Sequence, residues 1–239
     1  DLVRSRGLGD VYKRQTPIKV EQPKRIKHSF RLPRRNDNDE IVIHYLVKER
    51  CIDKEIVNYC IENYLLYEAQ KDHSAIFIGY DSHRLAKYAC KRGTDSDVKQ
   101  DIFGSDKAYS FSISNPNSNE LHVFESAIDL LSYMTLQKRN GKSYLNTNYL
   151  SLSGATTIGA SVEETTVPIA LETFLKDYPN IKNIRLHLDN DKAGKDTVLK
   201  IMYHYRELFH IVDEPPSIGK DVNEVLIKKA SRKKHFQVR

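Results

Sequence analysis

The sequence has no tryptophan, only three cysteines and no long hydrophobic run. A membrane-spanning helix needs about 20 consecutive apolar residues, so we expect no contact with a membrane. No signal peptide is visible, although a chain that has lost its first residues would not show one. With 39% hydrophobic and 29% charged residues, the composition is typical of a soluble globular protein, and we expect a cytoplasmic location.

The cysteines are Cys51, Cys60 and Cys90, and no two of them have Cys-x-x-Cys spacing. An odd number of scattered cysteines indicates reduced thiols in a cytosolic protein. We therefore expect neither a disulfide framework nor a zinc site in this chain.

The first residues do not read as part of a fold. Residues 5–15 resemble a translated sequencing adapter, and the last six of them back-translate as GAT GTG TAT AAG AGA CAG, similar to a transposase end sequence. We therefore interpret residues 1–15 as an artefact, although a natural flexible N-terminus is the alternative. If residues 1–15 come from an adapter, the chain is a fragment, and whether a further domain lies upstream stays an open question.

The chain is mildly basic, with a formal net charge of +6, which permits a nucleic-acid partner without requiring one. Residues 16–39 are polar, basic and interrupted by three prolines, so we expect a basic linker. It either touches phosphate groups or is a solvated tether. Residues 231–239 are expected to form a frayed basic tail.

Residues 40–118 have the pattern of a small α+β domain. Ile41–Val47 fits a strand or a helix equally well, whereas Asp53 is expected to cap a helix over 54–63. Three strands are predicted at 75–80, 85–90 and 108–113, and their close spacing favours an antiparallel meander.

Basic residues alternate with tyrosines in this region, a pattern that can bind a single strand through its phosphates and stacked bases. Ordinary surface lysines with half-buried tyrosines are the alternative. The basic residues are Arg84, Lys87, Lys91, Arg92 and Lys107, and the tyrosines are Tyr80, Tyr88 and Tyr109.

Residues 119–230 change to alternating strands and helices. Strands are predicted at 121–124, 149–152, 184–188 and 210–212, and helices at 127–138, 162–177 and 193–209, with a last helix ending near 230. Short apolar runs followed by helices indicate a mostly parallel, four-stranded sheet with crossover helices.

Carboxylates follow the strands of this predicted sheet. Glu125, Asp189 and Asp191 lie at strand ends, where open α/β sheets place their chemistry. Asp129 lies one helical turn after Glu125, and Asp221 lies in a third acidic turn. Each acid alone is commonly a helix cap, but the ordered set indicates a site for an oxygen-preferring cation such as Mg²⁺ or Mn²⁺.

These motifs resemble those of the Toprim domain, the metal-binding catalytic domain of bacterial-type primases, type IA and II topoisomerases and some nucleases. Val-Phe-Glu-Ser-Ala-Ile-Asp (123–129) matches its glutamate motif, and Leu-Asp-Asn-Asp-Lys-Ala-Gly (188–194) matches its Asp-x-Asp motif. Gly-Lys-Asp-Val-Asn-Glu (219–224) is similar to the third acidic turn. Primase-type members usually have a second aspartate where this chain has Asn223.

The upstream part resembles the N-terminal subdomain of the primase core, through Tyr45–Arg50 and Phe77–Gly79 with Arg84. Together the two parts are similar to the DUF3991-plus-Toprim proteins of plasmids and conjugative elements in Firmicutes, many of which carry a zinc ribbon further upstream. The implied fold class is α/β: a Rossmann-like Toprim domain at 119–230, with helices on both sheet faces, after a smaller α+β primase-core-like subdomain at 40–118.

The resemblance also implies roles for individual residues. Glu125 is the expected general acid/base, Asp189 and Asp191 the principal Mg²⁺ ligands, and Asp129 and Asp221 secondary acids. Template or nucleoside triphosphate is expected to contact the basic side chains of Arg84, Lys87, Lys91, Arg92, Lys107 and Lys220.

The leading hypothesis is a primase-like nucleotidyltransferase that makes short primers on single-stranded DNA for a mobile element, with a helicase or relaxase as a further partner. A Toprim nuclease is the second hypothesis, and a non-catalytic DNA-binding module is the third. A topoisomerase is disfavoured because no domain with a cleavage tyrosine is evident.

Overall fold

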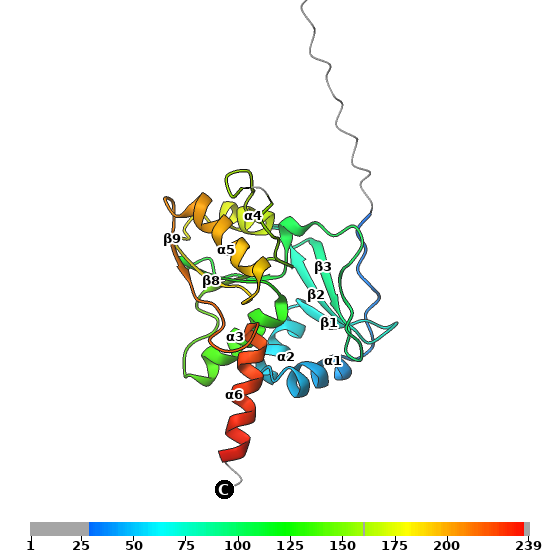
Figure 1. Ribbon diagram of the computed structural model, residues 1–239. Coiled ribbons are helices and arrows are strands. Elements are labelled where there is room, and N and C mark those ends of the chain that lie inside the picture. Colours follow the sequence, from blue (N-terminus) through cyan, green and yellow to red (C-terminus); the bar gives the residue numbers. More distant parts are fainter. Residues whose placement is uncertain (1–28, 160, 237–239) are drawn as a thin grey trace, which may run out of the picture.

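The computed structural model describes residues 29–159 and 161–236. The expected artefact at 1–15 and the first part of the expected linker lie outside these residues. The described chain builds two sheets, a four-stranded one of order β1-β2-β3-β4 and a five-stranded one of order β5-β7-β6-β8-β9 (Figure 1). Helices α1, α2, α3 and α6 lie together on one side of the molecule.

The chain between the linker and the first sheet is helical. α1 (Glu40–His44) continues into a π-helical turn, η1 (Tyr45–Glu49), and α2 follows at Lys54–Glu62. Asp53 caps α2, since its carboxylate accepts the amide hydrogen of Glu55 at 2.9 Å, as the sequence predicts. The open choice between strand and helix at Ile41–Val47 is settled as helix, because Val42, Tyr45 and Leu46 pack into one core at helical spacing.

The small sheet is antiparallel throughout and consists of β1 (Leu66–Glu68), β2 (Ala75–Tyr80), β3 (Ala86–Arg92) and β4 (Lys99–Asp101). Two of the predicted strands are therefore present. The sequence did not reveal β1 and β4, because each is three residues long and β4 has no apolar alternation.

The prediction of a third strand of this sheet at residues 108–113 is wrong. Residues 107–109 form a 3₁₀ turn, η2 (Lys107–Tyr109), and β5 (Ser112–Ile113) pairs antiparallel with β7 of the other sheet. Gly79 on β2 makes room for this crossing, since a Cβ at Gly79 would lie 1.7 Å from the Tyr109 carbonyl oxygen. A backbone contact of this kind leaves no periodic signal in the sequence.

The described end of the expected linker is packed against the small sheet. Arg35 forms a β-bridge with Ala69, and the Tyr67 hydroxyl donates to the Pro33 carbonyl at 2.6 Å. Phe30 packs on the apolar face of the sheet. Over residues 29–39 the expected linker is therefore packed against the sheet and is not the solvated tether that the sequence left as one alternative.

The large sheet contains four parallel strands, β6 (Glu120–Phe124), β7 (Asn148–Ser151), β8 (Asn183–His187) and β9 (His210–Asp213). This confirms the predicted fold class, and β5 adds a fifth, antiparallel edge strand. The helices are α3 (Ala127–Arg139), α4 (Ile169–Asp177), α5 (Lys192–Tyr205) and α6 (Val222–Phe236).

Helix boundaries differ most from prediction at the start of α4 and at the end of α6. α4 begins at Ile169, seven residues after the predicted start, with Pro168 as its cap. α6 extends to Phe236 and so includes residues that were expected to form a frayed tail. Both differences concern helix ends, which depend on local packing more than on periodicity.

Two cores cover the two faces of the large sheet. One joins α4 and α5 to the sheet through residues such as Leu171, Phe174 and Ile201. The other packs α3 and α6 against the sheet and continues without a break into α1, α2 and the small sheet. One shared core therefore holds the two sheets together, and it fixes the position of one sheet relative to the other.

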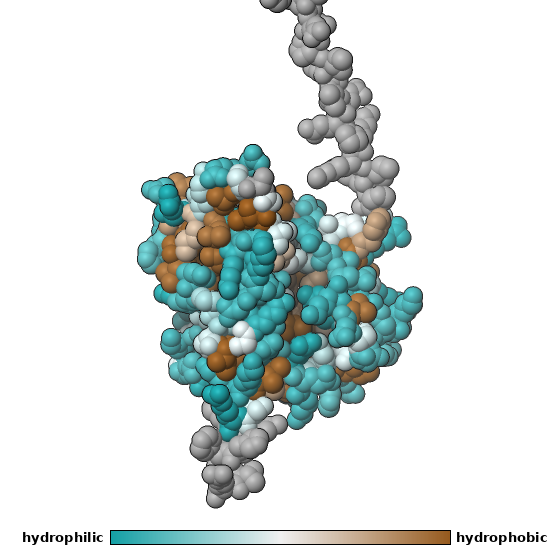
Figure 2. All heavy atoms as spheres, in the orientation of Figure 1, coloured by the Kyte–Doolittle hydropathy of each residue, from teal (hydrophilic) through white to brown (hydrophobic). Residues whose placement is uncertain are grey.

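The surface seen in Figure 2 is mostly hydrophilic, with hydrophobic residues gathered around α4 and α5. Ile169, Leu199 and Leu208 are exposed there. Among the described residues, no helix combines the length and the apolar character that a membrane span needs.

Candidate active site

The first acidic motif lies where β6 ends and α3 begins. Ser126 caps α3, and its hydroxyl donates to the Asp129 carboxylate at 2.5 Å. Asp129 is buried on the first turn of α3, and its second oxygen accepts the Asn223 amide hydrogen at 3.1 Å. Glu125 precedes the cap, so both carboxylates lie at the C-terminal edge of the sheet.

The Asp-x-Asp motif lies beside it, at the end of β8. Phe124 and His187 are paired in register on neighbouring parallel strands, so the residues that follow them emerge at the same edge. Asp191 caps α5 by accepting the Gly194 amide hydrogen at 3.0 Å. Glycine is required at 194, because an added Cβ would lie 2.1 Å from the Asp189 carbonyl oxygen.

The third acidic turn is tied to the second by Asn190. Its amide hydrogen is donated to the Lys220 carbonyl at 2.7 Å, and its side chain donates to the Pro216 and Gly219 carbonyls at 2.8 and 3.2 Å. Asp221 then starts α6, accepting the Glu224 amide hydrogen at 2.7 Å. All three acidic motifs therefore converge at one edge, as their order along the sequence predicts.

Asn223, which replaces an aspartate of the related motif, is fully engaged inside the protein. Its side-chain amide donates to the Arg50 carbonyl and to the Ser132 hydroxyl, each at 2.9 Å, and it is 3% exposed. These bonds link α6 to α3 and to the N-terminal domain. Asn223 is thus a structural residue rather than a free metal ligand.

The acids surround a polar cavity of about 140 Å³. Burial, reinforced by the Asp221 charge, raises the pKa of Asp129 to about 7. Burial and the Glu125 charge raise the pKa of Asp189 to about 7 as well. Burial and the Asp191 charge also raise the pKa of Glu125. The cavity is therefore a place where negative charge is concentrated and incompletely compensated.

One acidic oxygen in this cavity has no partner. Glu125 Oε2 is buried and makes no hydrogen bond within the described structure. A buried oxygen without a partner is costly, and a bound cation or a ligand hydroxyl would satisfy it.

Asp191 differs from its neighbours because it is already stabilised. The Gly194 amide and the Lys220 ammonium lower the pKa of Asp191. Lys220 Nζ lies 3.1 Å from Asp191 Oδ2 and 3.5 Å from Asp189 Oδ2. The hydrogen bond to Asp191 in turn raises the pKa of Lys220.

The oxygen donors fit a hard divalent cation in type but are not gathered around one point. Among the described residues, no three His, Cys, Asp or Glu side chains are arranged so that they could hold a metal ion. The unpaired Glu125 oxygen and the set of carboxylates match the chemistry of Mg²⁺. Binding would require the carboxylate side chains to move together and Lys220 to leave Asp189 and Asp191.

A second cavity of about 270 Å³ lies next to the first, between the small sheet and the start of α3. Arg92 and Lys99 are cross-strand partners on β3 and β4, and both line the two cavities. Lys107 lines the larger cavity, where its ammonium contacts Asp101 at 3.0 Å and the Ser153 carbonyl at 3.2 Å. Arg92 and Lys99 of the small sheet and Lys107 of η2 thus form a basic wall that faces the acids.

Three of the predicted phosphate-binding residues lie away from this wall. Successive residues of a strand face opposite sides, so Lys87 and Lys91 lie on the face of β3 opposite to Arg92. They pair there with Asp81 and Asp72, respectively. Arg84 lies in the β2–β3 turn, over the ring of Tyr80.

The predicted stacking surface of tyrosines is not present. Tyr88 is completely buried, and its hydroxyl donates to Asp101 at 2.5 Å. Tyr80 and Tyr109 are partly buried against the core. Conversely, the sequence analysis gave no binding role to Arg50, which it named only within the Tyr45–Arg50 motif, or to Lys99, and both line the acidic cavity.

Comparisons with known proteins match both halves of the chain. Residues 44–116 match a family described as a protein of unknown function (DUF3991), and residues 122–226 match a family described as Toprim-like. The chain combines a DUF3991 domain with a Toprim-like domain. This confirms the resemblance drawn from the acidic motifs.

An uncharacterized protein of Bacillus anthracis, pXO2-78, is 31% identical to the DUF3991–Toprim-like chain over 175 residues, which cover 68% of this chain and 46% of the relative. The chain thus spans about half the length of the curated relative that it matches. Among solved structures, the primase fragment of the bacteriophage T7 primase-helicase protein has a TM-score of 0.50 at 16% identity, covering 80% of this chain and 72% of that one. The Toprim-like domain therefore lies in a primase-like fold.

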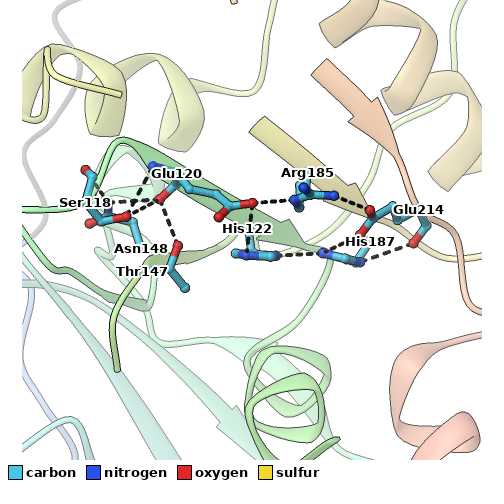
Figure 3. A network of polar contacts seen from close by, with 8 residues as sticks. All are labelled: Ser118, Glu120, His122, Thr147, Asn148, Arg185, His187 and Glu214. Atoms are coloured by element: carbon cyan, nitrogen blue, oxygen red, sulfur yellow. Dashed lines mark hydrogen bonds and ion pairs between the residues drawn. The ribbon is translucent and has the colours of Figure 1, made fainter. Parts of the chain in front are cut away.

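The Toprim-like domain also contains a polar network that the sequence did not predict (Figure 3). Arg185 on β8 lies between Glu120 and Glu214 and contacts both carboxylates. Beneath it, His122 Nδ1 and His187 Nε2 are 2.9 Å apart. Burial lowers the pKa of each imidazole to about 3, so both rings are neutral near pH 7.

The hydrogen positions in the histidine pair follow from its acceptors. His187 Nδ1 lies 3.2 Å from the Glu214 carbonyl oxygen, which can only accept, so Nδ1 carries the hydrogen. His187 Nε2 is then the acceptor for His122 Nδ1. Every charge in the network has a partner, which is typical of a structural role.

Proposed function

We propose that this protein is a primase-like, metal-dependent nucleotidyltransferase that synthesises short primers on single-stranded DNA. The observation that carries the proposal is the basic wall of Arg92, Lys99 and Lys107, which faces the buried carboxylates across two adjoining cavities. Phosphoryl transfer needs cationic groups for phosphates and oxygen ligands for divalent cations. The primase-like fold and the match to the Toprim-like family support the same chemistry.

The metal would be held by Asp189, Asp191 and Glu125, with Asp129 and Asp221 behind them. When bound, Mg²⁺ would neutralise charge on the phosphates and orient the reacting oxygens. Since burial holds the pKa of Asp189 near 7, we expect metal binding to release protons at neutral pH.

The protein's own residues have distinct tasks in this proposal. Glu125, whose pKa is raised by burial and by the Asp191 charge, accepts the proton of the primer 3′-hydroxyl. Arg92 and Lys99 bind the triphosphate at the junction of the two cavities. Lys107 is anchored to Asp101 and Ser153, and it positions the entrance of the larger cavity.

The whole protein's partners belong to the same proposal. Single-stranded DNA and nucleoside triphosphates are its substrates, and a helicase or a relaxase is the expected partner; the structurally similar T7 protein is a primase-helicase. A Toprim nuclease is the second candidate, because the same set of carboxylates can activate water for cleavage.

The test is an extension assay with Mg²⁺, labelled nucleotides and a single-stranded template. Extended products support a primase, a shortened template supports a nuclease, and a band shift alone supports a binding module. We expect Asp189→Asn and Glu125→Gln each to reduce extension by about 100-fold or more while template binding changes little.

Glu207→Gln is the matched control, because Glu207 is a highly exposed acid at the end of α5 that pairs only with its neighbour Arg206 among the described residues. It should leave extension unchanged. Full activity in both site variants would show that the site is assigned to the wrong residues.

A further inference from the structure

Lys220 has an unusual position for a lysine in a candidate metal site. Its ammonium lies between the two aspartates of the Asp-x-Asp motif, 3.1 Å from Asp191 Oδ2 and 3.5 Å from Asp189 Oδ2. These are the oxygens that a divalent cation would need. An ammonium and a metal ion cannot share them, because both carry positive charge and both need the same lone pairs.

The backbone of Lys220 is fixed in this position by the residue between the two aspartates. Asn190 donates to the Lys220 carbonyl at 2.7 Å and holds the Pro216 and Gly219 carbonyls with its side chain. Gly219 has a φ of +85° and lies against Glu224, so the turn has little freedom. The Asp-Asn-Asp sequence therefore supplies the two acids, Asp189 and Asp191, and also Asn190, whose hydrogen bonds hold the Lys220 backbone beside them.

The side chain of Lys220 is free to move although its backbone is not. It is 55% exposed at the mouth of the acidic cavity, which Arg92 and Lys99 also line. A lysine side chain has four flexible methylene groups, so its ammonium can leave the aspartates without any change in the fold. The direction open to it is the solvent side, where phosphates would enter.

We propose that Lys220 and the divalent cation exchange places: the ammonium neutralises Asp189 and Asp191 until the metal displaces it, and it then binds a phosphate of the incoming substrate. This inference rests on the metal site of the proposed function. It makes metal binding and phosphate binding mutually favourable, because a lysine released from two carboxylates attracts an anion more strongly. It also keeps the carboxylates from repelling one another before the metal enters.

The first test is the binding of Mn²⁺ alone, measured by electron paramagnetic resonance on the full chain. Lys220→Met removes the competing ammonium, and we expect its Kd for Mn²⁺ to fall by about three- to tenfold, in keeping with the modest strength of partly exposed ion pairs. Lys220→Arg keeps the charge and should bind Mn²⁺ no more tightly than the wild type.

Lys192→Met is the matched control. Lys192 lies next to Asp191 in the sequence but pairs with Asp196 at 2.8 Å, so its loss changes the net charge equally without freeing the two aspartates. Its Kd should stay within about twofold of the wild type. An unchanged or weaker Mn²⁺ affinity in Lys220→Met would overturn the exchange.

The second test asks whether the released Lys220 ammonium binds phosphate. The Kd for a labelled single-stranded oligodeoxynucleotide is measured with Mn²⁺ and with EDTA. The gain on adding Mn²⁺ should be larger in the wild type and in Lys192→Met than in Lys220→Met. An equal gain in all three proteins would contradict phosphate binding by Lys220.

Asp189→Asn separates the failure of this inference from failure of the proposed function. If Mn²⁺ binding depends on Asp189 but not on Lys220, the metal site stands and the exchange is wrong. If no protein, including Lys220→Met, shows Asp189-dependent binding, the metal site and the proposed function fail together.

Discussion

Two clusters of charged residues in the Toprim-like domain use the same strands in opposite ways. In the network of Figure 3, Arg185 is placed between Glu120 and Glu214, and His122 and His187 are neutral and bonded to each other. Each charged side chain there contacts one of opposite charge. This cluster stabilises the sheet through paired charges, and it also lines a cavity of about 380 Å³.

The acidic site at the ends of β6 and β8 is not balanced in this way. Carboxylates raise one another's pKa, and Glu125 keeps a buried oxygen without a partner. Such a site lowers stability unless a cation occupies it. The comparison teaches that a buried polar cluster signals function when a buried group such as Glu125 Oε2 is left without a partner, and structure when each charged group has one.

The largest expected effect is on the paired network. His122→Phe keeps the volume of the ring but leaves His187 Nε2 without its donor in a buried place. We expect the free energy of unfolding to fall by about 1–3 kcal/mol, as measured by urea denaturation at pH 8. Mn²⁺ affinity of the folded protein should not change. A loss of metal binding without a loss of stability would reverse the assignment of the two clusters.

A smaller effect of opposite sign is expected in the acidic site. Glu125→Gln removes a charge that burial and Asp191 disfavour, so the metal-free protein should gain stability, by at most about 1 kcal/mol, while it loses activity. The same urea measurement, made in EDTA, checks this. Destabilisation by more than about 1 kcal/mol would mean that Glu125 is a structural residue.

The smallest effect is the pH dependence of these two changes. The lowered pKa of His122 means that its favourable contribution is present above about pH 6.5 and is lost as the pH falls. The cost of His122→Phe should therefore be smaller at pH 5 than at pH 8.

Raised pKa values, such as that of Glu125, act in the other direction: the folded protein is favoured while the acid is protonated, and that stability is lost as the pH rises. The gain from Glu125→Gln should thus be larger at pH 8 than at pH 5, by about 1 kcal/mol or less. Urea midpoints at both pH values check the two signs.

Local patterns in the sequence predicted most of the elements of the Toprim-like domain. Apolar runs followed by Glu125 and by Asp189 marked strand ends, because side-chain periodicity and capping act over a few residues. The small sheet was less predictable, since β4 has no apolar alternation and residues 108–113 were wrongly assigned to it. Their place in the large sheet depends on β7, more than thirty residues away.

The basic residues show the same limit. Strand alternation fixes that Arg92 and Lys91 face opposite sides, but the sequence does not say which side faces the acids. Only the packing of the N-terminal helices and the small sheet into the shared core decides this, and it also brings Arg50 and Lys99 to the cavity. Contacts between distant segments leave no spacing that a single sequence displays.

By itself, the sequence determined that acidic residues end successive strands of an α/β sheet, because the chain order of a parallel sheet brings those ends to one edge. Only the tertiary structure decided which charges meet there. It enclosed Asn223, turned Lys87 and Lys91 away, and set Lys220 between two aspartates through Asn190. The physical reason is that capping and periodicity are local, whereas burial and charge pairing depend on segments that meet only in the folded chain.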